Sequence, residues 1–135
     1  MKKSKIFIIV SLCFIIALIV SGYLIYTSLF PMAEQIESPH PDTILSFSVK
    51  DNSNNELRVD NVYSFYDCLL NSKPTRIMSV NDYPDARPYY EVYITTADNK
   101  VYRYYLYHSN GKDYIEIPYV GVYEIQNFGI DNLFV

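Results

Sequence analysis

The chain has 135 residues, of which half are apolar and 16% are aromatic, so its composition excludes a disordered chain and fits one folded domain plus an anchoring or targeting segment. Charge is uneven: three lysines lie in the first five residues, whereas all fifteen acidic residues lie at or beyond Glu34, giving residues 34–135 a net charge of −7. An acidic domain without a basic stripe repels phosphate backbones, which argues against a nucleic-acid partner.

The first predicted element is the uncharged apolar segment from Ile6 to Phe30, which Lys5 precedes and Pro31 follows. At about 1.5 Å per residue, a helix of this length spans roughly 37 Å, enough to cross a hydrocarbon core of about 30 Å. A lone segment in lipid must be helical because every backbone N–H and C=O needs an internal partner. We therefore predict a transmembrane signal-anchor helix over residues 6–30.

The flanking residues predict how this helix is oriented. Lys2, Lys3 and Lys5 favour a cytoplasmic basic tail over residues 1–5, and Tyr23 and Tyr26 suit the opposite membrane interface. The expected protein is single-pass in the cell membrane, with its C-terminal domain extracytoplasmic.

Two alternatives treat the apolar segment as a leader. A secretory signal cleaved near Ser21-Gly22 would release the domain, but the apolar residues 23–26 continue where a cleaved signal turns polar. A lipoprotein signal would use Cys13, for which Leu12 is a poor preceding residue and too little apolar sequence lies upstream. Either alternative still exports the domain.

Residues 31–42 contain three prolines and three carboxylates without periodic apolar positions, which predicts an extended linker that holds the folded part off the membrane. The extracytoplasmic α+β domain is expected over residues 43–135. It begins with a strand whose buried face is formed by Leu45, Phe47 and Val49.

Residues 51–56 place oxygen-bearing side chains at alternate positions, as a calcium loop does. The pattern lacks glycine at its sixth position and has Val62 where the closing glutamate would stand. A polar hairpin turn leading into Leu57 and Val59 is the favoured interpretation, and no metal site is predicted.

One helix is predicted in the domain, with an apolar face formed by Val62, Phe65, Tyr66, Leu69 and Leu70. Asp60 or Asn61 can cap it, and Pro74 prevents its continuation. Cys68 borders the apolar face and is expected to be a buried, unreactive thiol; with Cys13 in the apolar segment, no disulfide is implied. A further strand is expected over Thr75–Val80, and a loop over residues 81–85.

Turn residues predict the pairing of the remaining strands. Asn110-Gly111 is the preferred pair for a two-residue hairpin turn, because both positions need positive φ. A preceding three-residue loop of residues 97–99, with Asn99 left-handed, keeps apolar residues on one face. These turns pair Leu106 with Ile115, Tyr104 with Ile117, Tyr107 with Tyr114, Tyr105 with Glu116, Ile94 with Tyr102, Val92 with Tyr104, and Tyr90 with Leu106.

The resulting three-stranded meander has one core face and one face that we name the tyrosine face. The tyrosine face consists of Tyr89, Glu91, Tyr93, Arg103, Tyr105, Tyr107, Tyr114 and Glu116. Tyrosine gives large contact area at small entropic cost, so this face is the candidate site for a peptide, glycan or protein contact. The competing interpretation is that the tyrosines only steady the sheet, or that the hairpin carrying Leu45 and Phe47 covers them.

Two segments resemble a known family. Residues 79–84 (SVNDYP) and 115–123 (IEIPYVGVY) are similar to those of an uncharacterised bacterial family of small exported or membrane-anchored domains. The resemblance covers about residues 43–127 and implies a compact α+β domain in the envelope of a Gram-positive organism, without an established activity or catalytic residues.

Catalytic chemistry would have to draw on Asp82, Asp85, Glu91, Glu116 or His108. The two glutamates are expected about 9.6 Å apart on a flat sheet face, which is no cleft, and His108 is expected opposite Asp113 as a surface residue. No enzyme motif, catalytic residue or cofactor is predicted.

The overall expectation is an α+β protein: a transmembrane helix, then a small antiparallel sheet of about five to six strands with one packed helix. Its expected function is non-enzymatic binding outside the membrane. The alternatives are a structural or accessory envelope protein and, more distantly, a carboxylate-based hydrolase.

Overall fold

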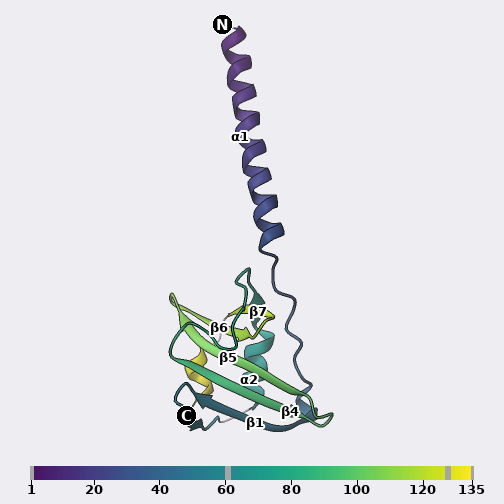
Figure 1. Ribbon diagram of the computed structural model, residues 1–135, viewed down its shortest axis with the longest axis vertical. Helices are drawn as coiled ribbons and strands as arrows, with labels where there is room; N and C mark the ends of the chain where they lie inside the picture. The colour runs from purple at the N-terminus through teal and green to yellow at the C-terminus, as the bar shows by residue number, and fades with distance from the viewer. Residues whose placement is uncertain (1, 60–61, 127–128, 135) are drawn as a thin grey trace. The chain divides into compact units, whose positions relative to one another are not determined.

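The computed structural model describes residues 2–59, 62–126 and 129–134. The chain forms two compact units, Met1–Pro31 and Met32–Val135, which are described separately (Figure 1). The predicted helix caps, Asp60 and Asn61, lie outside the described residues.

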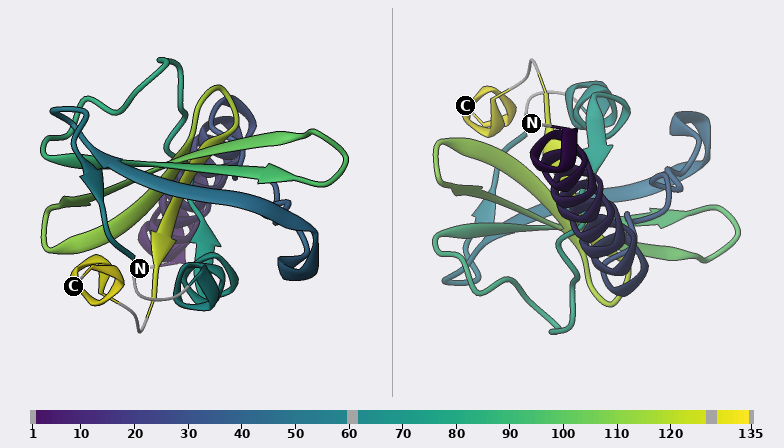
Figure 2. Two further views of the ribbon diagram at one scale, coloured as in Figure 1. Left: turned by 90° about the horizontal axis from the view of Figure 1, so that it is seen from below. Right: turned by 90° about the horizontal axis from the view of Figure 1, so that it is seen from above.

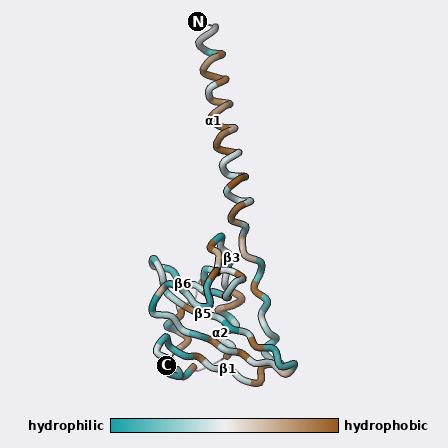
Figure 3. Tube along the Cα trace, viewed as in Figure 1, coloured by the Kyte–Doolittle hydropathy of each residue, from teal (hydrophilic) through white to brown (hydrophobic). Residues whose placement is uncertain are grey.

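The first unit is the helix α1 (Lys2–Leu29). Its segment Lys5–Leu29 has a mean hydropathy of 2.8 and is long and apolar enough to cross a membrane, a property that secretory signal sequences share. Figure 3 shows apolar residues along its whole length, and its large apolar side chains are exposed. So much exposed apolar surface is unstable in water, which fits either a bilayer anchor or a leader removed on export.

The second unit is an α+β domain in which the described residues form an antiparallel sheet of seven strands, in the order β2-β1-β4-β5-β6-β7-β3. The fold class is as predicted, with one or two more strands than expected. The strands are β1 (Ile44–Asp51), β2 (Glu56–Leu57), β3 (Ser72–Pro74), β4 (Tyr89–Thr96), β5 (Val101–Ser109), β6 (Lys112–Ile117) and β7 (Gly121–Ile125). The helical elements are α2 (Val62–Leu70) and the short 3-10 helices η1 (Pro41–Thr43) and η2 (Ile130–Leu133).

The core lies between one face of the sheet and α2, with η2 on the same side (Figure 2). Alternate residues of the central strands point into it, among them Val92, Tyr104 and Leu106, each at most 1% exposed. From α2, Phe65 packs edge-on against Tyr104, with ring centroids 5.5 Å apart. Burying side chains of this size contributes about 1.5–3 kcal/mol each, so this face organises the fold.

Both predicted hairpin turns are confirmed. Asn110 and Gly111 have φ of 51° and 75°, and Asn99 has φ of 62°. The β4–β5 pairs and the β5–β6 pairs from Tyr105↔Glu116 onward match the predicted register. Local turn chemistry therefore assigns every tyrosine of these strands to its face.

Two other predictions are wrong. Leu45 is 67% exposed instead of buried, because the β1–β4 register shifts between Ile44 and Ser46 and a bulge turns it outward. Thr75–Val80 is not a strand; the strand there is β3, which pairs with β7 at the edge of the sheet and accommodates Pro74 at its end.

Residues 32–40 contain no described helix or strand, as an extended segment should, yet they contact the domain. The Ala33 amide donates to the Thr75 carbonyl at 3.0 Å, and Ala33 and Ile36 pack against the hydrophobic core. The Tyr104 hydroxyl donates to the Glu37 carbonyl at 3.4 Å. The segment thus lies along the domain surface.

Candidate functional site

The tyrosine face is a single face of β4, β5 and β6, opposite α2. Glu91 and Glu116 both pair with Tyr105, one from each neighbouring strand, and Tyr107 pairs with both Tyr89 and Tyr114. Because side chains alternate along a strand, these pairings bring all eight predicted residues to one side of the sheet. The face is nevertheless divided into an open part and a covered part.

The open part is formed by Tyr89, Glu91, Tyr93 and Arg103, which are partly exposed. Together with Tyr105, which is only 1% exposed, they form what we name the Arg103 cluster. Glu91 Oε1 accepts hydrogen bonds from Arg103 Nε at 2.6 Å, from the Tyr93 hydroxyl at 2.8 Å and from the Tyr105 hydroxyl at 2.8 Å. The Arg103 guanidinium also lies over two rings, 5.0 Å from the Tyr105 centroid and 5.7 Å from that of Tyr93. One carboxylate oxygen therefore fixes three side chains.

Charge and burial set the protonation states in this cluster. Burial raises the pKa of Glu91, but hydrogen bonds from Tyr105, Tyr93 and Arg103 outweigh it and hold the pKa below its ordinary value. Burial and the hydrogen bond to Glu91 raise the pKa of Tyr105. At neutral pH the cluster therefore holds a carboxylate, a guanidinium and neutral phenols, and 40% of the Arg103 side chain remains exposed.

The covered part contains Tyr107 and Glu116, which are 8% and 7% exposed. The cover is the connection from residue 75 to residue 88, which lies on the side of the sheet opposite α2 (Figure 2). Two of its residues are buried anchors: Pro84, less than 2% exposed, and Ser79, whose Oγ donates to Glu116 Oε1 at 2.7 Å. The cover predicted from the hairpin of Leu45 and Phe47 is wrong, because Phe47 packs on the core face against Phe65.

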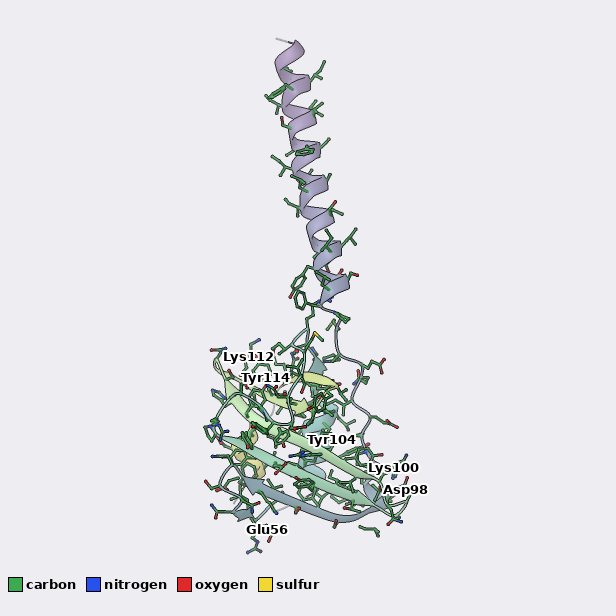
Figure 4. The ribbon with its side chains drawn as sticks, in the orientation of Figure 1. Glu56, Asp98, Lys100, Tyr104, Lys112 and Tyr114 are labelled. Atoms are coloured by element: carbon green, nitrogen blue, oxygen red, sulfur yellow. The ribbon has the colours of Figure 1, made fainter. Side chains whose placement is uncertain are left out.

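A cleft of about 440 Å³ lies where this connection meets the sheet, and we name it the loop cleft. Its floor includes Tyr107 and Tyr114, whose rings stack with centroids 5.6 Å apart and an interplanar angle of 27°. Its walls include Ile77, Met78, Val80, Asn81, Asp85 and Glu116. Figure 4 shows Tyr114 on β6, at this end of the sheet.

The candidate carboxylates are divided between two places. Glu116 and Asp85 both line the loop cleft, whereas Glu91 does not line it and is engaged by Arg103. His108 pairs with Asp113 across β5 and β6, Nδ1 to Oδ1 2.8 Å, and 65% of its side chain is exposed. Within residues 2–59, 62–126 and 129–134, no three His, Cys, Asp or Glu side chains lie together as a metal site requires.

Sequence reasoning missed the connection that makes the cleft. Met78 and Ser79 lie in Thr75–Val80, which is predicted as a strand, and Asp85 lies in the predicted loop. Ser79 meets Glu116, which is 37 positions further along the chain. Residues 79–84 carry the family resemblance, but neither that resemblance nor the predicted loop over residues 81–85 indicates that the segment covers the tyrosine face.

Comparison with solved structures finds a protein from Ruminococcus gnavus, determined by NMR, that is 28% identical to this chain. The match covers 73% of this chain and 99% of that one, with a TM-score of 0.56. Comparison with curated proteins gives no match. Residues 32–124 match a family described as a domain of unknown function, and this confirms the resemblance carried by residues 79–84 and 115–123. The chain therefore belongs to the family Domain of unknown function (DUF5300).

Proposed function

We propose that this protein is anchored in the cell membrane by α1 and binds a peptide or protein partner outside the cell through its tyrosine face, without catalysing a reaction. The observation that carries the proposal is the Arg103 guanidinium, held over two tyrosine rings while 40% of its side chain stays exposed. Tyrosine and arginine are enriched among residues that dominate binding energy, and a pre-ordered side chain loses little entropy on binding.

The outward location is supported by the distribution of charge. Lys2, Lys3 and Lys5 precede the apolar helix, and the acidic residues all follow it. By the positive-inside tendency, the lysine end stays in the cytoplasm. Protease added to intact cells should therefore degrade the domain; full protection, with degradation only after lysis, would contradict this location. Recovery of the domain from the medium without α1 would instead favour the secreted alternative.

The binding role is tested by capture from solubilised envelope, using the full-length protein in mild detergent. Tyr93→Ala and Arg103→Ala should each reduce capture of a partner by about tenfold or more, because each removes contact area from the open part of the face. Tyr63→Ala is the matched control, since Tyr63 is a 60% exposed tyrosine on α2, opposite the tyrosine face. Equal capture by all three variants, each folded by circular dichroism, would count against the proposal.

The alternative is a structural or accessory envelope role. It is favoured by the hydrogen bonds of Glu91, which satisfy Tyr93, Tyr105 and Arg103 within the chain. The same capture experiment separates the two roles. If the cluster is purely structural, the variants change the stability of the domain without changing capture of a partner. A glycan partner would appear as capture on envelope polysaccharide in place of protein.

A further inference from the structure

The loop cleft holds a buried negative charge without a cation. Glu116 is 7% exposed and accepts a hydrogen bond from Ser79. Among the described residues, no ion pair within 4 Å includes Glu116 or Asp85, the second carboxylate of the cleft. A carboxylate that is largely removed from water is stabilised by a nearby positive group, so this arrangement favours an external cation.

The aromatic floor of the cleft identifies the kind of cation. Tyr107 and Tyr114 both line the cleft and stack on each other, and aromatic faces attract ammonium and guanidinium groups. Burial, followed by the charge of Glu116, raises the pKa of Tyr107, so its phenol stays neutral. No lysine, arginine or histidine lines the cleft within the part of the chain that the structure describes. The site therefore combines negative charge with aromatic surface and has no competing cation of its own.

One part of the cleft wall is apolar, and we name it the rim. It consists of Ile77, Met78 and Val80, which are 52%, 58% and 63% exposed. An inorganic divalent cation would gain nothing from such a rim, and the described residues include no group of three His, Cys, Asp or Glu side chains that could hold a metal ion. A ligand with an aliphatic chain that ends in a positive group matches both surfaces, because the chain suits the apolar rim and the charge suits the aromatic floor. The volume of about 440 Å³ is within the usual range of ligand pockets.

We propose that the loop cleft binds a primary ammonium on an aliphatic stem, as presented by a lysine side chain of a peptide. The ammonium contacts the carboxylates of Glu116 and Asp85 and the face of Tyr114, while the methylenes lie against Met78 and Val80. This inference rests on the proposed function and names the chemistry that the covered half of the tyrosine face recognises.

The test is an NMR titration of the full-length protein in neutral detergent micelles with N-acetyl-lysine N′-methylamide. The matched probe is the norleucine analogue, which keeps the aliphatic stem and lacks the ammonium. The lysine probe should shift the amide resonances of Tyr107, Tyr114 and Glu116 in a saturable manner. The norleucine probe should bind at least about tenfold more weakly, since it makes no charge-assisted hydrogen bond. Equal affinities for both probes would overturn the proposal.

Variants locate the site. Glu116→Gln keeps the oxygen that accepts from Ser79 and removes the charge, so affinity for the lysine probe should fall by about tenfold or more. Asp85→Asn, at an exposed position, should weaken binding of the lysine probe less than Glu116→Gln does. It is the variant to test if Glu116→Gln does not fold. Glu56→Gln makes the same charge change on β2, at the far edge of the sheet (Figure 4), and should leave affinity unchanged. Equal loss in all three variants would indicate nonspecific attraction to an acidic domain and would overturn the site.

The outcome is separable from that of the capture experiment. If Tyr93→Ala abolishes partner capture while the lysine probe fails to bind, only the cation site is overturned. If binding of the lysine probe requires Glu116, while the Tyr93→Ala and Arg103→Ala variants capture the partner as well as the wild type does, only the role proposed for the Arg103 cluster is overturned.

Discussion

Ser79 and Glu116 lie 37 positions apart and are joined by a hydrogen bond of 2.7 Å between Ser79 Oγ and Glu116 Oε1. Ser79 Oγ also accepts a hydrogen bond from the Tyr119 amide at 3.3 Å. One hydroxyl thus connects the segment 75–88 both to β6 and to the turn after it. This pair is one of the contacts that hold the cover over the tyrosine face.

Ser79→Ala should destabilise the domain by about 1–3 kcal/mol, because it removes a hydroxyl that donates to the buried Glu116 carboxylate. The free energy of unfolding in urea measures the loss, and hydrogen exchange should become faster at amides of residues 75–88. Ser53→Ala, at an exposed turn position, is the control and should change stability by no more than about 0.5 kcal/mol. Equal stability of the two variants would mean that Ser79 does not secure the cover.

Glu91 should stabilise the fold at neutral pH and lose this effect in acid. Its folded-state pKa lies below the ordinary value of 4.5 because hydrogen bonds from Tyr105, Tyr93 and Arg103 outweigh burial. A carboxyl whose pKa is lowered by folding contributes fully above its unfolded pKa, and the contribution disappears as pH falls through the folded pKa. The free energy of unfolding of the wild type should therefore exceed that of Glu91→Gln by about 1–3 kcal/mol above about pH 5.5. This difference should narrow below about pH 4.

Urea unfolding of the wild type and of Glu91→Gln across this pH range measures the difference in their free energies of unfolding. Glu56→Gln provides the control, because Glu56 is exposed on the edge strand β2 and its loss should be nearly neutral at every pH. A difference that stayed constant down to about pH 3 would show that the charge of Glu91 has no part in stability.

Gly121→Ala should displace residues 32–40 from the domain surface. A Cβ at position 121 would lie 2.5 Å from Ala33 Cβ, so the extended segment must shift, at a cost of about 1–3 kcal/mol. Ala33→Gly in the same chain should restore part of the lost unfolding free energy. Gly22→Ala, where an added Cβ meets nothing within 4 Å, is the control. No rescue by Ala33→Gly would contradict the packing of this segment.

Cys68 should be inert in the folded protein. Burial, with a smaller effect of the Asp113 charge, raises the pKa of its thiol to about 12, and the side chain is fully buried. In a Cys13→Ser variant, which leaves one thiol, maleimide should label Cys68 only after unfolding in urea. Rapid labelling under native conditions would show that the packing between α2 and the sheet opens readily.

The central strands could be predicted from sequence because their turns are local. Asn99, Asn110 and Gly111 need positive φ, and each requirement is met within a few residues of the turn. Once those turns are placed, alternation assigns Tyr105 and Tyr104 to opposite faces. The register that brings Glu91 and Glu116 to either side of Tyr105 follows without knowledge of the rest of the fold.

Long-range contacts could not be predicted in this way. The bulge that turns Leu45 outward depends on how β1 meets β4, and β3 forms at Ser72–Pro74 only because β7 lies beside it. The cover over the tyrosine face rests on Pro84 and on the Ser79 contact, in a segment where the sequence predicts a strand over Thr75–Val80 that does not form. Sequence patterning identified which residues share the face, and tertiary contacts decide which of them solvent reaches.

Site-specific photo-cross-linking in intact cells tests the central claim most directly. A photoreactive phenylalanine analogue in place of Tyr93, in the Arg103 cluster, should give a discrete cross-linked species on irradiation, and the same analogue in place of Tyr63 on α2 should not. Cross-linking at neither position, with both proteins folded and present in the membrane fraction, or equal cross-linking at both, would contradict recognition through the tyrosine face.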